Sequence, residues 1–196
     1  ITMNYLANAL PIGGNTTGDI SGKYQSLFTP SGFTFSIWGL IYVLLGVFVL
    51  YIFSEPNETL TKHATSILIF FNLVNVFNGL WLFAWHHDQI FLSTLVMIGL
   101  LVGLLIILRL VSIQDKLAYA TFSIYAGWIS VALIANVTIW IVKADIGFFM
   151  SHEYLWFFII LGVSLVIGLF MVIKEKNYFY GAVFLWAYIG IASKFL

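Results

Sequence analysis

The sequence predicts an all-α integral membrane protein, and three properties of the chain lead to this fold class. Of its 196 residues, 62% are hydrophobic and only 8% are charged, whereas about a quarter of the residues of a soluble domain carry charge. The mean hydropathy is +1.04. Stretches without charge recur along the chain, several of them close to the roughly 20 residues that a helix needs to cross a hydrocarbon core.

The charges exclude several kinds of partner. Eight basic residues balance eight acidic ones, so neither a nucleic-acid-binding face nor a basic lipid-binding patch is indicated. Cysteine is absent, which rules out disulfides and thiolate metal sites. We therefore expect membrane lipid and hydrophobic small molecules as partners, and no nucleic acid.

Seven membrane crossings are predicted. Residues 1–10 have the character of the last turns of a first helix, incomplete at the N-terminus, which Pro11 and the glycines after it end. A polar loop over residues 11–33 is expected to fold back over the mouth of the bundle. The other helices are expected at residues 35–54, 64–85, 90–111, 118–142, 154–173 and 178–193.

Basic residues give a weak preference for one orientation. One set of alternate loops carries five of them and the other set carries three. By the positive-inside rule the loop between the second and third helices is expected to be cytoplasmic. The five are Lys62, Arg109, Lys116, Lys174 and Lys176, and the three are Lys23, Lys143 and Lys194.

No Asp, Glu, Lys or Arg lies in the middle of a predicted span. Because ionisable residues within a membrane usually mark proton relays, ion paths and voltage sensors, this pattern disfavours a pump, an ion-coupled transporter or a channel with a charged filter. A neutral ligand fits the sequence better.

The third span places amides beside tryptophan. Asn75, Asn78, Leu82 and Trp85 fall within an arc of about 80° at 100° per residue, so they share one face of the helix. An unpaired amide in hydrocarbon costs several kcal/mol, and we therefore expect these asparagines to face the bundle.

The fifth span has a similar face. Tyr125, Trp128, Ala132, Asn136 and Trp140 fall within an arc of about 120°, and the small Ala132 leaves space between the larger groups. Two interpretations stay open. The amides can be interhelical hydrogen-bonding groups with tryptophans filling space, or the faces can line a cavity for a flat, largely apolar ligand.

A cluster of polar residues in the loops offers a further candidate site. His86, His87, Asp88, His152 and Glu153 are expected on one side of the membrane. Adjacent histidines do not share a helical face as the two ligands of a His-x-x-x-His pair do, so we predict no metal site and no catalytic residues.

Three motifs, in order, resemble the translocator-protein family, also called tryptophan-rich sensory proteins. Residues 28–42, FTPSGFTFSIWGLIY, are similar to that family's aromatic, proline-containing loop followed by Trp-x-x-x-Tyr, here Trp38 and Tyr42. Residues 78–85, NGLWLFAW, resemble its Asn-x-x-Trp in the third helix, and residues 135–140, ANVTIW, its Asn and Trp in the fifth.

The sequence also departs from that family. Ser31, Gly32 and Phe33 stand where the family usually has a second proline and a tryptophan, and two further spans follow residue 143. We therefore expect a longer, divergent branch with a family-like five-helix bundle over residues 1–143 and two additional transmembrane helices over residues 144–196.

The resemblance implies a membrane receptor or carrier that binds a flat hydrophobic molecule, such as a porphyrin or a sterol, between its helices, often as a homodimer. No cofactor is expected to be required, and a tetrapyrrole or lipid is the molecule that the cavity would hold. The porphyrin-degrading activity attributed to some members is not assigned here. The expected ligand-binding residues are Trp38, Tyr42, Asn75, Asn78, Trp81, Trp85, Tyr125, Trp128, Asn136 and Trp140.

Two alternatives belong to other classes. In an accessory subunit of a membrane complex, the small-residue pairs Gly99-x-x-x-Gly103 and Ser164-x-x-x-Gly168 would contact partner helices. In a seven-helix retinal protein, Lys194 would carry the Schiff base, but it lies at the end of its span and no acidic counter-ion occurs within a helix.

Overall fold

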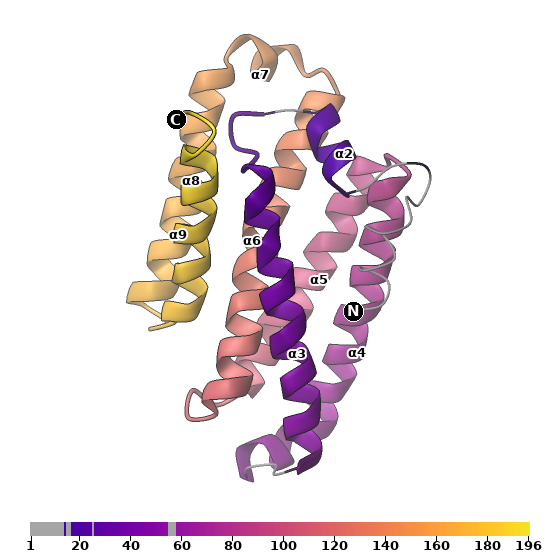
Figure 1. The fold of residues 1–196 in the computed structure, drawn as a ribbon, viewed down its shortest axis with the longest axis vertical. Helices are drawn as coiled ribbons and strands as arrows, with labels where there is room; N and C mark the ends of the chain where they lie inside the picture. The colour runs from indigo at the N-terminus through magenta and orange to yellow at the C-terminus, as the bar shows by residue number, and fades with distance from the viewer. Residues whose placement is uncertain (1–13, 15–16, 25, 55–57) are drawn as a thin grey trace.

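The computed structural model describes residues 14, 17–24, 26–54 and 58–196, and within them it is all-helical (Figure 1). The first predicted helix, residues 1–10, lies outside the described residues. The elements are α2 (Thr17–Lys23), the 3-10 helix η1 (Gly32–Ser36), α3 (Ile37–Ser54), α4 (Glu58–His86), α5 (Ile90–Leu110), α6 (Lys116–Lys143), α7 (Gly147–Ser151), α8 (Glu153–Ile173) and α9 (Tyr178–Ala192).

Five helices of the described chain are long and apolar enough to cross a membrane, and they are those predicted for the second to sixth spans. The predicted seventh span is α9, which has only 15 residues. At 1.5 Å per residue it is about 22 Å long, shorter than the roughly 30 Å hydrocarbon core. The protein is thus an integral, multi-pass membrane protein.

Helix α6 lies at the centre of the bundle (Figure 1). It packs against α5, α9, α3 and α8, while α4 packs along α5 and α8 along α9. In an 18-residue apolar stretch of α6, 61% is buried inside the bundle, whereas the corresponding stretch of α8 is 17% buried. The largest fully buried side chains on α6 are Phe122 and Trp128. Because α6 touches neighbours on most sides, it carries many of the buried residues of the described bundle.

Polar side chains fix the start of α9 against α6. The side chain of Asn177 caps α9 by accepting from the Tyr180 amide at 3.0 Å. Its Nδ2 donates to Ser123 on α6 at 2.8 Å, and the Tyr180 hydroxyl donates to Ser130 at 2.6 Å. These two interhelical hydrogen bonds satisfy buried polar side chains that water does not reach. Helix α9 is therefore attached to α6 by hydrogen bonds as well as by packing.

Both small-residue pairs pack within the chain. A Cβ added at Gly103 would lie 2.9 Å from Val74 of α4, and one at Gly99 would lie 3.1 Å from Phe77. On α8, Ser164 hydrogen-bonds Tyr188 of α9 at 3.0 Å. These pairs therefore bring α4 to α5 and α8 to α9, where contacts within the chain occupy the positions that the accessory-subunit alternative would use for a partner.

The basic residues separate by end as predicted. Lys23, Lys143 and Lys194 lie at the end that holds α2, α7 and the C-terminus, at the top of Figure 1. At the other end Arg109 pairs with Glu175 at 2.8 and 3.1 Å. Which of the two ends faces the cytoplasm stays a prediction.

Candidate functional site

A cavity of about 40 Å³ lies between α3, α4, α5 and α6, and we call it the tryptophan cavity. Four tryptophans contribute to its walls, and the segment that leads into α3 closes one side. Its lining residues are Thr17, Ser21, Thr29, Pro30, Phe35, Trp38, Trp81, Trp85, Met97, Trp128, Val131, Ala132, Ala135, Asn136 and Ile139.

Four aromatic rings form a continuous stack along one wall. Tyr42 stacks on Trp38 with centroids 5.5 Å apart, Trp38 on Trp81 at 6.4 Å, and Trp81 on Trp85 at 5.8 Å. The planes differ by only 21°, 27° and 29°. Trp128 meets Trp38 edge-on at 6.4 Å. Trp38, Trp81 and Trp85 line the cavity, whereas Tyr42 continues the stack but does not line it.

Three buried donors among these lining residues lack an acceptor. The Nε1 atoms of Trp81 and Trp128 and the Nδ2 atom of Asn136 have no hydrogen-bond partner in the described part of the chain. Each buried donor left unsatisfied costs about 1–3 kcal/mol, so three around one cavity require an explanation. A ligand that brings acceptors would satisfy them.

The carboxamide of Asn136 is held by α5. Its oxygen accepts from the hydroxyls of Ser93 at 3.1 Å and Thr94 at 2.8 Å. Both hydroxyls are buried and also lie within hydrogen-bond distance of the Ile90 carbonyl. The amide is therefore oriented by its oxygen, while its nitrogen is left without a partner.

Asn78 and Tyr125 support the wall without lining the cavity. The Asn78 amide donates to the Tyr125 hydroxyl at 3.2 Å, joining α4 to α6. The Tyr125 ring meets Trp38 edge-on at 5.9 Å. This pair is buried behind the stack, where it fixes the position of Trp38.

Two predicted residues lie elsewhere. Asn75 is exposed, and its amide donates to the Phe71 carbonyl of its own helix at 2.9 Å. The expectation that it faces the bundle is wrong, because a local bond to the preceding turn satisfies the amide donor without burial. Trp140 packs against Phe91 of α5 at 5.3 Å, and it does not line the cavity.

The described residues of the first loop fold over the bundle mouth, as predicted, and form the roof of the cavity. Trp85 donates its Nε1 proton to the Thr17 carbonyl at 3.2 Å, which uses the one donor of this tryptophan to hold α2. The roof includes Thr29 and Pro30, while Phe35 of η1 meets Trp128 edge-on at 5.8 Å.

Asp88 anchors α2 to the helix ends. Its carboxylate accepts from Lys23 at 2.7 Å and from the Tyr24 hydroxyl at 2.8 Å, and Lys143 of α6 lies 2.9 Å from its other oxygen. Partial burial alone raises the pKa of Asp88, but the hydrogen bonds from Lys23, Lys143 and Tyr24 outweigh it and hold the pKa below its ordinary value. The hydrogen bond with Asp88 likewise raises the pKa of Lys23.

A second anchor joins the loop to the C-terminal helix. The Lys194 ammonium donates to the carbonyls of Ser26 at 2.9 Å and Thr29 at 2.8 Å. The Ser31 amide donates to the carbonyl of Gly190 at 3.0 Å. The roof is therefore attached on one side to α4 and α6 and on the other side to α9.

His86 and His87 have separate contacts. Nδ1 of His86 lies 2.7 Å from the Leu82 carbonyl, whereas His87 is exposed and packs on Phe83. No group of three or more His, Asp or Glu side chains in the described ranges is arranged to hold a metal ion.

Sequence reasoning missed the roof residues and Met97. Thr17, Ser21 and Thr29 belong to an irregular segment that has no helical period to place them. Ala132, noted for the space it leaves, and Ala135 line the cavity from α6, so small residues beside Trp128 and Asn136 were a usable signal.

Fold and site together define a class: a multi-pass helical membrane protein whose bundle encloses a tryptophan-walled, amide-bearing cavity beneath a folded loop. The chain belongs to the TSPO-like protein family, whose model matches residues 1–195. The match therefore includes α8 and α9 as well as the bundle. The predicted division of the chain at residue 143 stays a prediction. No curated protein and no solved structure matches the chain.

Proposed function

We propose that this protein is a membrane receptor or carrier that binds a flat hydrophobic molecule with several hydrogen-bond acceptors in the tryptophan cavity. The observation that carries the proposal is the set of three unpartnered donors, on Trp81, Trp128 and Asn136, among aromatic walls. A tetrapyrrole that carries carboxylates offers several acceptor oxygens at its edge, whereas a sterol offers one hydroxyl. The donors therefore favour the tetrapyrrole.

The roof must move for such a ligand to enter. A volume of about 40 Å³ holds a few water molecules, since one needs about 10–15 Å³. A planar polycycle needs several hundred Å³. For such a ligand we infer that access requires the described residues of the roof, Thr17–Lys23 and Thr29 to Phe35, to leave one of their two anchors.

Porphyrin titration tests the proposal. Protoporphyrin is added to the protein in lipid nanodiscs, and binding is followed by the Soret absorbance, which does not depend on the number of tryptophans. Trp81→Phe and Trp128→Phe keep an aromatic ring but remove the donor. Each is expected to raise the Kd about five-fold, the equivalent of about 1 kcal/mol for one hydrogen bond.

Trp140→Phe is the matched control, because Trp140 lies outside the cavity. It is expected to bind as the wild type does. Equal Kd values for all four proteins, or no saturable Soret shift in the wild type, would refute porphyrin binding in this cavity. Saturable binding of labelled cholesterol that Trp81→Phe weakens, together with no Soret shift on adding porphyrin, would assign the cavity to a sterol.

The accessory-subunit alternative has lost its supporting feature. Both pairs of small residues that would have contacted a partner are occupied by helices of the same chain.

A further inference from the structure

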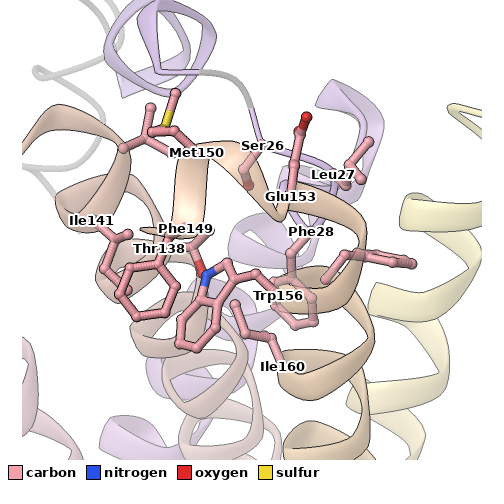
Figure 2. A pocket seen from close by; sticks show the side chains of 12 residues that line it. Ser26, Leu27, Phe28, Thr138, Ile141, Phe149, Met150, Glu153, Trp156 and Ile160 are labelled. Carbon is pink, nitrogen blue, oxygen red and sulfur yellow. The ribbon is translucent and has the colours of Figure 1, made fainter. Parts of the chain in front are cut away.

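A second hollow lies at the edge of the predicted membrane region, away from the tryptophan cavity. It has a volume of about 150 Å³ and lies between the first loop, the end of α6, α7 and the start of α8 (Figure 2). We call it the α7–α8 pocket. Phe28 of the loop, Thr138 and Ile141 of α6, Phe149 of α7 and Trp156 of α8 line it.

The pocket contains an unsatisfied donor of its own. Figure 2 shows the Trp156 indole lying across the middle of the pocket. Its Nε1 atom is buried and has no hydrogen-bond partner among the described residues, and Phe149 packs against the ring at 4.3 Å. Because an indole nitrogen is a donor only, the group that satisfies it has to be an acceptor such as a carbonyl oxygen.

An apolar groove continues from the pocket along the outside of the bundle. This α8–α9 groove has a volume of about 540 Å³ and shares Leu27 and Phe157 with the pocket. It extends past Leu161 to Leu165, which is 48% exposed. Because α8 is a candidate membrane span and the groove residues are apolar, we expect the groove to face lipid.

One negatively charged side chain, Glu153, and one positively charged side chain, Lys194, lie near the mouth of the pocket. Glu153, the first residue of α8, lines the pocket, and in Figure 2 its carboxylate points away from the Trp156 indole, toward the rim. The Lys194 ammonium is bound to the Ser26 and Thr29 carbonyls. Burial lowers the pKa of Lys194, and the nearby charge of Glu153 partly offsets this. The mouth therefore carries balanced charge.

We propose that the α7–α8 pocket and the α8–α9 groove together bind one zwitterionic glycerophospholipid. An ester carbonyl accepts from Trp156 Nε1, an acyl chain lies in the groove, and the headgroup ammonium faces Glu153. A volume of about 150 Å³ accommodates a group of about the size of benzene, which suits the ester segment and not the whole lipid. The balanced mouth favours a headgroup without net charge.

The proposal is tested with the full chain in nanodiscs of equal parts phosphatidylethanolamine, phosphatidylcholine and phosphatidylglycerol, followed by native mass spectrometry after release into mild detergent. The wild type is expected to retain one zwitterionic lipid per chain. Trp156→Phe, which removes the donor, is expected to lower retention about five-fold, the equivalent of about 1 kcal/mol. Leu165→Trp, which fills the groove, is expected to abolish it.

Two matched variants serve as controls. Leu169→Trp changes a leucine of α8 that is also 48% exposed but does not line the groove, and Trp140→Phe removes a tryptophan that lines neither hollow. Both are expected to retain lipid as the wild type does, and circular dichroism checks that all variants fold. Equal retention in every variant, or preferential retention of phosphatidylglycerol, would overturn the proposal.

Discussion

The indole rings of Trp38 on α3 and Trp81 on α4 stack with centroids 6.4 Å apart and planes 27° apart. This contact joins two helices on one side of the tryptophan cavity, and it is the central step of the four-ring stack. The two residues are 43 positions apart in sequence, so only the folded bundle brings them together.

A double-mutant cycle should detect this contact. Trp38→Leu and Trp81→Leu, alone and together, are expected to show a coupling free energy of about 0.5–1.5 kcal/mol, as aromatic pairs do. The measurement is reversible unfolding in mixed micelles. The cycle that combines Trp38→Leu with Trp140→Leu should give a coupling near zero because those rings do not touch. Equal coupling in both cycles would contradict the stack.

The Asp88 anchor should hold α2 closed. Asp88 has a left-handed backbone conformation with φ 58°, which asparagine also tolerates. The change Asp88→Asn therefore removes only the negative charge that pairs with Lys23 and Lys143. Faster hydrogen exchange is expected over residues 17–24, measured by mass spectrometry. Asp145→Asn, at a residue with φ 47° in an exposed turn, is the matched control and should leave this exchange unchanged.

The same anchor should depend on pH in one direction. Because the pKa of Asp88 is lowered in the folded protein, its contribution is fully present above the unfolded value of about 3.9 and is lost as the pH falls through the folded value. Wild-type exchange over residues 17–24 should therefore rise only below about pH 4, whereas Asp88→Asn should lack this rise. A transition near pH 6 would indicate a histidine instead.

The two asparagines of α4 should differ in their effect on stability. Asn78→Leu leaves the buried Tyr125 hydroxyl without its amide donor and is expected to cost about 1–3 kcal/mol. Asn75→Leu, which removes an exposed amide bonded only within its own helix, should be neutral or mildly stabilising in lipid. Thermal unfolding in nanodiscs compares the two, and equal losses would place Asn75 in the interior after all.

Gly190 of α9 packs closely against Thr34 of η1. A Cβ at this position would lie 1.9 Å from the Thr34 hydroxyl oxygen, so Gly190→Ala has to displace η1 and is expected to cost about 1–3 kcal/mol. Gly162→Ala on α8 is the matched control, since nothing lies within 4 Å of its added Cβ. There, helix propensity predicts a gain of about 0.5–1 kcal/mol in the unfolding free energy.

Helical period explains why part of the site was predictable. Trp81 and Trp85 share a face of α4, and Trp128, Ala132 and Asn136 share a face of α6, as their spacing at 100° per residue requires. The same arithmetic failed for Asn75. It places side chains on a helix but does not say where the buried sector of that helix ends, and Asn75 lies just beyond it.

By itself, the sequence determined the membrane class, the described spans and the tryptophan-rich faces, because these depend on composition, length and local period. Tertiary structure alone decided which buried donors are left without an acceptor. It also decided that Gly99 and Gly103 pack against α4, and that Asp88 and Lys194 bind the roof of the cavity. The physical reason is that hydrogen bonds and close packing between distant segments depend on how the helices are arranged in space, and no local pattern records that arrangement.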